Sequence, residues 1–299
     1  MAEQRDNKDI LKEVCHLSRQ NMFGPARQLI LQAAGITQEE RAKIPAGQMG
    51  KYILDKCKNP NIQRMIFVEK AFYDLWALGK RDADSDPSIS EASSCIEQLE
   101  NIMPFLSKED KLYAKYWQSY YYRYVKPDND KYRYDLLIEV MQKTPQGSSE
   151  ANTRFSDCSG IIFSLEVPLS DKYKGIKLAQ QKTTPEHFAH EHYKKMLSQV
   201  APGYYDELLR DASSTEKSYD TRKENYLAAL NVVSDMDLSE ERKNARKLYI
   251  YGQLVPLQQQ HNDPARFELY KKQQTLIYKQ ARIQKALGIY QYRAFDPYS

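Results

Sequence analysis

The chain has 299 residues, of which 41% are hydrophobic, and its 44 basic and 40 acidic side chains give a formal net charge of +4. This hydrophobic fraction, together with only 11 glycines and 13 prolines, excludes an intrinsically disordered chain. No apolar run reaches the length of a membrane span. The near balance of charge argues against a general nucleic-acid-binding surface. We therefore expect a globular protein whose partners are neither membranes nor nucleic acids.

The four cysteines are far apart in the sequence and form no CxxC pair; they are Cys15, Cys57, Cys95 and Cys158. Such a spread is typical of reduced thiols in the cytosol. The polar N-terminal stretch MAEQRDNKDI also lacks the apolar segment of a secretory signal. Both features predict a cytoplasmic protein.

Apolar residues recur at helical spacing along the chain, and no segment shows the two-residue alternation of a half-buried strand. In chain order, helices are predicted over residues 10–23, 25–35, 62–81, 90–106, 107–125, 131–144, 152–167, 171–181, 184–200, 202–212, 221–233, 239–260 and 264–292. A further helix opens at Thr37, which forms a capping-box pattern with Glu40. Pro45 weakens that helix, and KNPN at 58–61 interrupts it. Such a chain buries its apolar stripes by stacking antiparallel helices, which predicts an all-α bundle or solenoid.

The sequence contains no GxSxG, Walker A, GxGxxG or HExxH element. It therefore lacks the residues on which the enzyme classes with these motifs depend. His187, His190 and His192 cluster in HFAHEHYKK, and the first two share a helical face with Glu191. A metal site is conceivable there, but a fourth ligand is missing and a solvated helix face explains the same pattern. We expect a protein that is not an enzyme, with no cofactor and no metal.

The stretch YAKYWQSYYYRYVKPDND, residues 113–130, is unusually rich in tyrosine. Its aromatic residues recur at helical spacing, as packing residues do, and Arg123 stands alone among them. A partial tetratricopeptide-repeat pattern is also present, with Arg133 where that repeat has a small residue; its matching positions are Trp117, Tyr120, Tyr124, Leu137, Val140 and Pro145. A helical-repeat interaction scaffold without phosphate dependence is therefore the alternative interpretation.

Several short stretches resemble the 14-3-3 family, and they occur in the order found in that family. They are HLSRQNMF at 16–23, TQEER at 37–41, YYRY at 121–124, NDK at 129–131, IFSLEVPLSDKYKGIKLAQ at 162–180 and LLRDA at 208–212. The resemblance implies a 14-3-3-like domain over residues 1–213, with nine antiparallel helices. It also implies a homodimer and a groove that binds phosphoserine or phosphothreonine peptides, hence an adaptor that regulates client proteins in signalling.

The resemblance assigns the phosphate to Arg123 and Tyr124 in YYRY, since a phosphate favours a bidentate guanidinium and further donors. It also implies two cations on the third helix, seven residues apart, and Lys51 and Lys58 have this spacing, with Lys56 as a substitute. Lysine in the second place keeps the charge but loses the planar fork of an arginine.

The expected peptide groove departs from the family pattern. Its predicted residues are Ser159, Ile162, Glu166, Leu208 and Ala212. Ser159 and Ala212 stand where the family has asparagines that hold a peptide backbone, which predicts weakened or altered specificity. Residues 214–299 have no counterpart in the family, and their periodicity predicts additional helices packed on the domain.

Overall fold

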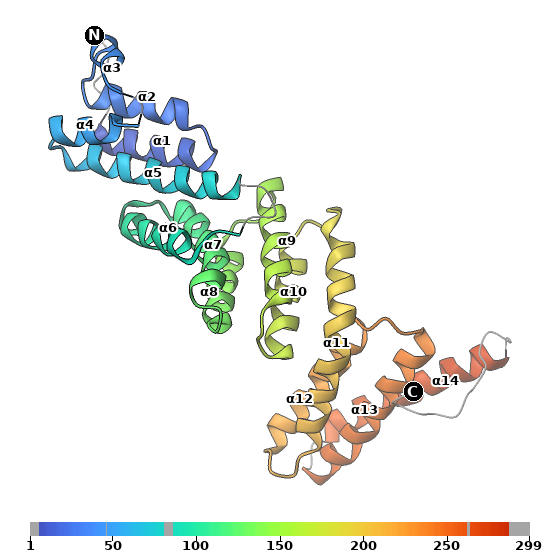
Figure 1. Cartoon of the computed structure of the whole chain (residues 1–299). Coiled ribbons are helices and arrows are strands. Elements are labelled where there is room, and N and C mark those ends of the chain that lie inside the picture. The colour runs from blue at the N-terminus through green and yellow to red at the C-terminus, as the bar shows by residue number, and fades with distance from the viewer. Residues whose placement is uncertain (1–5, 46, 81–85, 262–263, 287–299) are drawn as a thin grey trace. The chain divides into compact units, whose positions relative to one another are not determined.

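The structure is a computed structural model that describes residues 6–45, 47–80, 86–261 and 264–286. All the regular elements of these residues are helices, so the predicted all-α class is confirmed. The chain divides into two compact units, Met1–Val167 and Pro168–Ser299. The first unit is blue to green in Figure 1, and the second runs from green to red.

The first unit contains nine α-helices among its described residues. They are α1 (Asn7–Arg19), α2 (Phe23–Ala33), α3 (Gln38–Ala42), α4 (Met49–Lys56), α5 (Pro60–Gly79), α6 (Ile89–Ile102), α7 (Lys108–Val125), α8 (Asp130–Lys143) and α9 (Ser149–Ser164). A short 3-10 helix, η1 (Met103–Phe105), follows α6. The helices of the second unit are α10 (Leu169–Lys182), α11 (Ala189–Ser213), α12 (Tyr219–Val233), α13 (Glu240–Gln260) and α14 (Pro264–Ala286).

Side-chain caps fix several helix starts where the sequence predicts them. Thr37 and Glu40 form the expected capping box at the start of α3. Ser107 caps α7, since its Oγ accepts the backbone N–H of Asp110 at 3.1 Å. Pro60 occupies the first turn of α5, where its missing N–H is not needed.

The core of the first unit lies around α5, which packs against α1, α2 and α6. Met65 and Val68 on α5 are fully buried, as are Val14 on α1 and Leu99 on α6. Helix α7 packs against α6 and α8 and also contacts α1. At the α1–α7 contact, the buried guanidinium of Arg19 lies 3.4 Å from a carboxylate oxygen of Asp110. This pair compensates two charges that burial would otherwise leave unsolvated.

In the second unit, α11 packs against α10 and α12, and α13 packs against α12 and α14. The loop after α12 is tied to α10 by Asp235, which accepts a hydrogen bond from Tyr173 at 2.5 Å and forms an ion pair with Lys177 at 3.1 Å. Burial raises the pKa of the Tyr173 phenol, and the hydrogen bond to Asp235 raises it further. The phenol therefore remains a donor at neutral pH.

The structure corrects two helix boundaries. Helix α11 begins at Ala189 and not at Thr184, because residues 185–188 form turns. It then continues through Pro202, where we expected two separate helices. Proline removes one helical hydrogen bond, and buried neighbours such as Tyr204 and Tyr205 hold the helix in place across it.

The described residues up to Ser213 contain eleven α-helices, and α3, α4 and α5 together occupy the place of one interrupted helix. Counted in this way, nine helical segments precede residue 214. The end of α11 coincides with the predicted domain border at 213, whereas the border between the compact units lies between Val167 and Pro168. A 14-3-3-like domain over residues 1–213 stays a prediction.

Cysteine alkylation tests this packing. Cys15, Cys95 and Cys158 are buried, whereas Cys57 is partly exposed, and burial raises the pKa of the Cys15 thiol to about 12. Since the thiolate is the reactive form, we expect iodoacetamide to modify Cys57 first in the folded protein, as measured by peptide mass spectrometry. Urea-unfolded protein, in which all four should react alike, is the control. Faster labelling of Cys15 than of Cys57 would contradict the packing of α1.

Candidate functional site

Helix α7 carries a row of aromatic rings that pack against one another and against the core. The indole ring of Trp117 is stacked on the ring of Tyr121, with centroids 5.9 Å apart and planes at 23°. Tyr113 meets Phe72 of α5 edge to face at 5.6 Å. Tyr121 is only 1% exposed. Most of the tyrosines in this stretch therefore serve packing, as their spacing predicts.

Arg123 lies at the exposed edge of this aromatic row, in the last turn of α7. Its guanidinium carbon is 4.5 Å from the ring centroid of Tyr120 and 4.3 Å from that of Tyr124. Its Nη2 donates to the hydroxyl of Tyr120 at 3.3 Å and also to the hydroxyl of Tyr124. Two aromatic faces thus hold the guanidinium by cation–π attraction while 39% of the side chain remains exposed.

Arg123 and Tyr124 converge on one carboxylate oxygen. Asp86 Oδ1 accepts a hydrogen bond from the Tyr124 hydroxyl at 2.7 Å and lies 3.4 Å from Arg123 Nη2. The carboxylate is 76% exposed, so it binds at the surface and not in a closed pocket. Arg123 and Tyr124 together form a site for one anionic oxygen, which Asp86 supplies here, and we call this the Arg123 anion site.

Asp86 is a residue of this site that the sequence analysis missed. It lies just before Ser88, the N-cap of α6, and α6 packs against α7. The aspartate-rich sequence DADSDP, residues 82–87, precedes that cap. If α6 and α7 are taken as an antiparallel pair, the start of α6 meets the end of α7, so these aspartates were the available signal.

The two predicted lysines lie elsewhere in the first unit. Lys51 is on α4, but Lys58 follows the end of that helix, so the two do not share a helical face. A Cβ added to Gly50 would lie 3.5 Å from Ile66 of α5. A Cβ added to Gly79, at the other end of α5, would lie 3.9 Å from the Trp117 side chain of α7.

These two contacts show how far Lys51 lies from Arg123 along α5. Ile66 and Gly79 are thirteen residues apart on α5, which corresponds to about 20 Å at the rise of an α-helix. Lys51 therefore lies near one end of α5, and Arg123 lies beyond the other end. Lys58 Nζ instead donates to the carbonyl oxygen of Leu54 at 3.4 Å.

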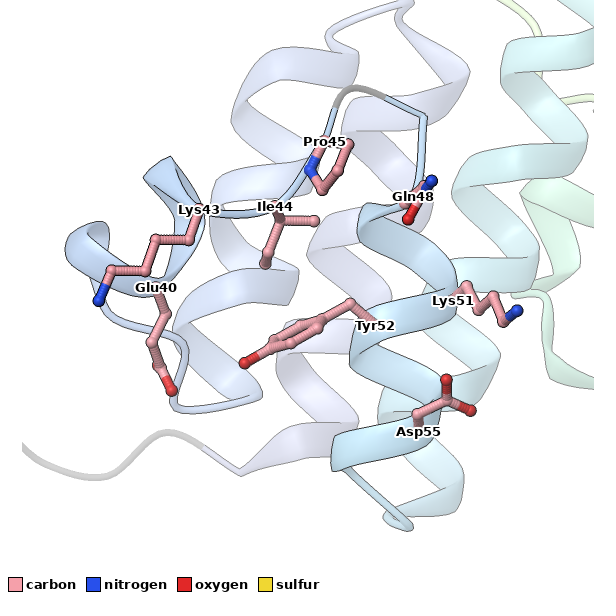
Figure 2. Close-up of a pocket in the computed structure, with 8 residues that line it drawn as sticks. All are labelled: Glu40, Lys43, Ile44, Pro45, Gln48, Lys51, Tyr52 and Asp55. Atoms are coloured by element: carbon pink, nitrogen blue, oxygen red, sulfur yellow. The ribbon is translucent and has the colours of Figure 1, made fainter.

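Lys51 instead borders a separate cavity of about 270 Å³ between α3 and α4 (Figure 2). Its lining residues are Glu40, Lys43, Ile44, Pro45, Gln48, Lys51, Tyr52 and Asp55. Lys56, the predicted substitute, forms an ion pair with Glu40. The hydrogen bond from Lys56 lowers the pKa of the Glu40 carboxyl, and the backbone N–H of Thr37 adds to this. Lys56 is thus already engaged with a carboxylate.

The predicted groove residues fall in both compact units. Ser159, Ile162 and Glu166 belong to the first unit, and Leu208 and Ala212 to the second. Ser159, Ile162 and Ala212 expose no surface, and Ser159 Oγ donates to the carbonyl of Ser156 at 2.7 Å. Glu166 is exposed, and its backbone N–H donates to Asp130 Oδ2 at 2.5 Å. A peptide groove made by these residues stays a prediction.

The histidine cluster has local structural partners. The backbone N–H of Ala189 donates to His187 Nδ1 at 3.3 Å, and His190 Nε2 lies 3.0 Å from the carbonyl oxygen of Thr184. His187 precedes α11, so it does not continue the helical face of His190. In the described part of the chain, no group of three or more histidine, cysteine or acidic residues is arranged to hold a metal ion. No described helix is long and apolar enough to cross a membrane.

No protein-family model, curated protein or solved structure matches this chain. The resemblance to 14-3-3 proteins therefore depends on the short stretches in the sequence and on the order of the helices that carry them.

The exposed position of Arg123 predicts that its removal leaves the fold intact. We expect Arg123→Ala to change the free energy of unfolding by less than about 1 kcal/mol, as is usual for exposed ion pairs. Tyr121→Ala should cost about 3–5 kcal/mol, because it empties a buried aromatic site. Urea unfolding followed by circular dichroism measures both values. A large loss in Arg123→Ala would show that this residue holds the helices together.

Proposed function

We propose that this protein binds segments containing phosphoserine or phosphothreonine, and that it acts as a 14-3-3-like adaptor in signalling. The observation that carries the proposal is the convergence of Arg123 Nη2 and the Tyr124 hydroxyl on one carboxylate oxygen of Asp86. The residues assigned to phosphate by the YYRY stretch thus already hold an anionic oxygen in the folded chain.

A phosphate group is a stronger ligand for such a pair than a carboxylate. It carries nearly two negative charges at neutral pH and has three acceptor oxygens. A guanidinium can hold two of these oxygens with parallel hydrogen bonds, and the Tyr124 hydroxyl supplies a further donor. Because Arg123 and Asp86 are both exposed, the exchange of Asp86 for a phosphate needs no unfolding.

The helix order supports the adaptor assignment. With α3–α5 counted as one interrupted helix, YYRY falls on the fifth helical segment, α7, and LLRDA on the ninth, α11. These are the positions that the resemblance implies. The same resemblance carries the proposal of a homodimer and of cytoplasmic clients.

The proposed site is weaker than a complete phosphate clamp. Lys51 and Lys58 lie away from Arg123, and Ser159 and Ala212 offer no exposed donors. The phosphate would then be bound chiefly by one guanidinium and one hydroxyl. We propose that binding is correspondingly weak and that its specificity differs from that of a typical family member.

Fluorescence anisotropy with a labelled phosphoserine peptide library tests the proposal. We expect binding that requires the phosphate, and a loss of about tenfold or more in Arg123→Ala, because a charge-assisted contact contributes about 1.5–3 kcal/mol. Arg246→Ala is the matched control, since Arg246 also lies over a tyrosine ring, 4.8 Å from the centroid of Tyr205. Unphosphorylated twins that bind equally well would refute the proposal.

Removal of Asp86 should have the opposite effect. Asp86→Asn abolishes the charge that competes with the phosphate, so we expect affinity for the same phosphopeptides to rise about two- to fivefold, the range of an exposed ion pair. The matched control is Asp220→Asn, because Asp220 is also 76% exposed and also pairs with a cation, Lys223. Unchanged affinity in Asp86→Asn would mean that Asp86 does not occupy the ligand position.

A helical-repeat scaffold is the second candidate, and the order of contacts favours it. From α5 to α9, each helix packs against the next one along the chain, as in repeat proteins. The buried Arg133 opposes this interpretation, since its Nε donates to the carbonyl oxygen of Ser119 at 2.9 Å where the repeat has a small residue. Phosphate-independent binding of clients in the anisotropy experiment would favour the scaffold.

A further inference from the structure

The last described helix, α14, concentrates positive charge. It contains six basic residues, Arg266, Lys271, Lys272, Lys279, Arg282 and Lys285, and the single acidic residue Glu268, a net charge of +5. The whole chain has a net charge of only +4. The near balance of the overall composition therefore conceals one strongly basic element.

One face of α14 packs on α13 (Figure 1). Tyr270 is buried, and its ring lies 6.1 Å from that of Tyr251 on α13. A Cβ added to Gly252 of α13 would lie 3.9 Å from Gln274. Tyr270 and Gln274 are four residues apart and so share one face, which is the inner face of α14.

The opposite side of α14 carries two partly exposed leucines. Leu269 is 51% exposed and Leu276 is 43% exposed. They are seven residues apart, so they lie in one line along the helix. Lys272 and Lys279 have the same spacing and are exposed on the same side. Two leucines seven residues apart form one apolar line, which is half of the heptad pattern by which one helix packs along another.

We propose that this outer face, made by Leu269, Lys272, Leu276 and Lys279, docks an acidic amphipathic helix of a partner protein. The leucines would pack against apolar residues of the partner, and the lysines would pair with its carboxylates. The proposal is independent of the Arg123 anion site, which lies in the other compact unit.

The charge of the face selects this occupant over a second copy of the chain. Each copy carries Lys272 and Lys279 beside its leucines, so a pairing of two copies through their leucines would join two faces of like charge. Like charges that face each other across a helix pair oppose association. A helix with glutamate or aspartate beside its apolar line has the complementary charge.

The probe is a fluorescein-labelled peptide of leucine–glutamate heptads, titrated with the full-length protein and followed by fluorescence anisotropy. We expect binding that weakens as salt is raised, and no binding of a twin peptide with lysine in place of glutamate. Leu269→Ser/Leu276→Ser should lower the affinity at least about tenfold, because each leucine loses its apolar contact. The charge reversal Lys272→Glu/Lys279→Glu should exchange the preference, so that the lysine twin binds instead.

Two controls separate docking from damage to the fold. Phe188→Ser removes a side chain that is 80% exposed at the start of α11, and it should bind the peptide like the wild type. Arg123→Ala should also leave this binding unchanged. Circular dichroism checks that the leucine variant retains its helix content, as the exposure of both leucines predicts.

Three outcomes would overturn the proposal. The first is equal binding of the glutamate and lysine peptides by the wild-type protein. The second is a leucine-dependent change of mass in sedimentation equilibrium, which would assign the face to a second copy. The third is leucine-dependent binding to phosphatidylserine-containing vesicles without binding of the peptide, which would assign it to a membrane surface.

Discussion

Burial of the aromatic face of α7 is the constraint on which the candidate site depends. The helix packs against α6 and α8 and touches α1, so its orientation about its own axis is set by the large rings that it buries, Tyr121 above all. Once Tyr121 and Tyr122 face inward, Arg123, which is about 200° around the helix from Tyr121, faces outward. Arg123 and Tyr124 reach the edge of the surface for this reason, and they need no separate device to place them there.

A second network keeps the end of α7 in register with its neighbours. The buried guanidinium of Arg133 on α8 binds the carbonyl oxygen of Ser119 on α7 and pairs with Asp130 at 2.7 Å. Asp130 in turn accepts the backbone N–H of Glu166, just after α9. A buried charge is tolerated only when it is paired in this way. The network therefore connects α7, α8 and the end of α9, and it joins the NDK stretch to Glu166, two parts of the sequence in which the family resemblance was found.

Sequence reasoning succeeds here where a local rule decides the structure. Caps such as Thr37 and Ser107 act within one helical turn, and they were predictable from spacing alone. The course of α11 through Pro202 was not, because packing of the flanking tyrosines outweighs the local cost of the proline. Lys51 and Lys58 do not share a helical face for a related reason. The break before Pro60 redirects the chain, so a spacing of seven residues no longer places two side chains on one face. The position of Asp86 beside Arg123 depends on the pairing of α6 with α7, which no local rule predicts.

The two proposed surfaces bind their ligands by different chemistry, and each is expected to bind weakly by itself. At the Arg123 anion site the carboxylate of Asp86 competes with a phosphate for Arg123, and the outer face of α14 offers only two leucines and two lysines. A client that carried both a phosphorylated residue and an acidic helix would engage both surfaces of one chain only if the segment between them were long enough to span the two. Its second contact would then form at the effective concentration set by the link between the two, which can exceed the free concentration of the client by orders of magnitude. Weak, exchangeable contacts at each surface are therefore compatible with a selective adaptor, because selectivity would come from the requirement for both.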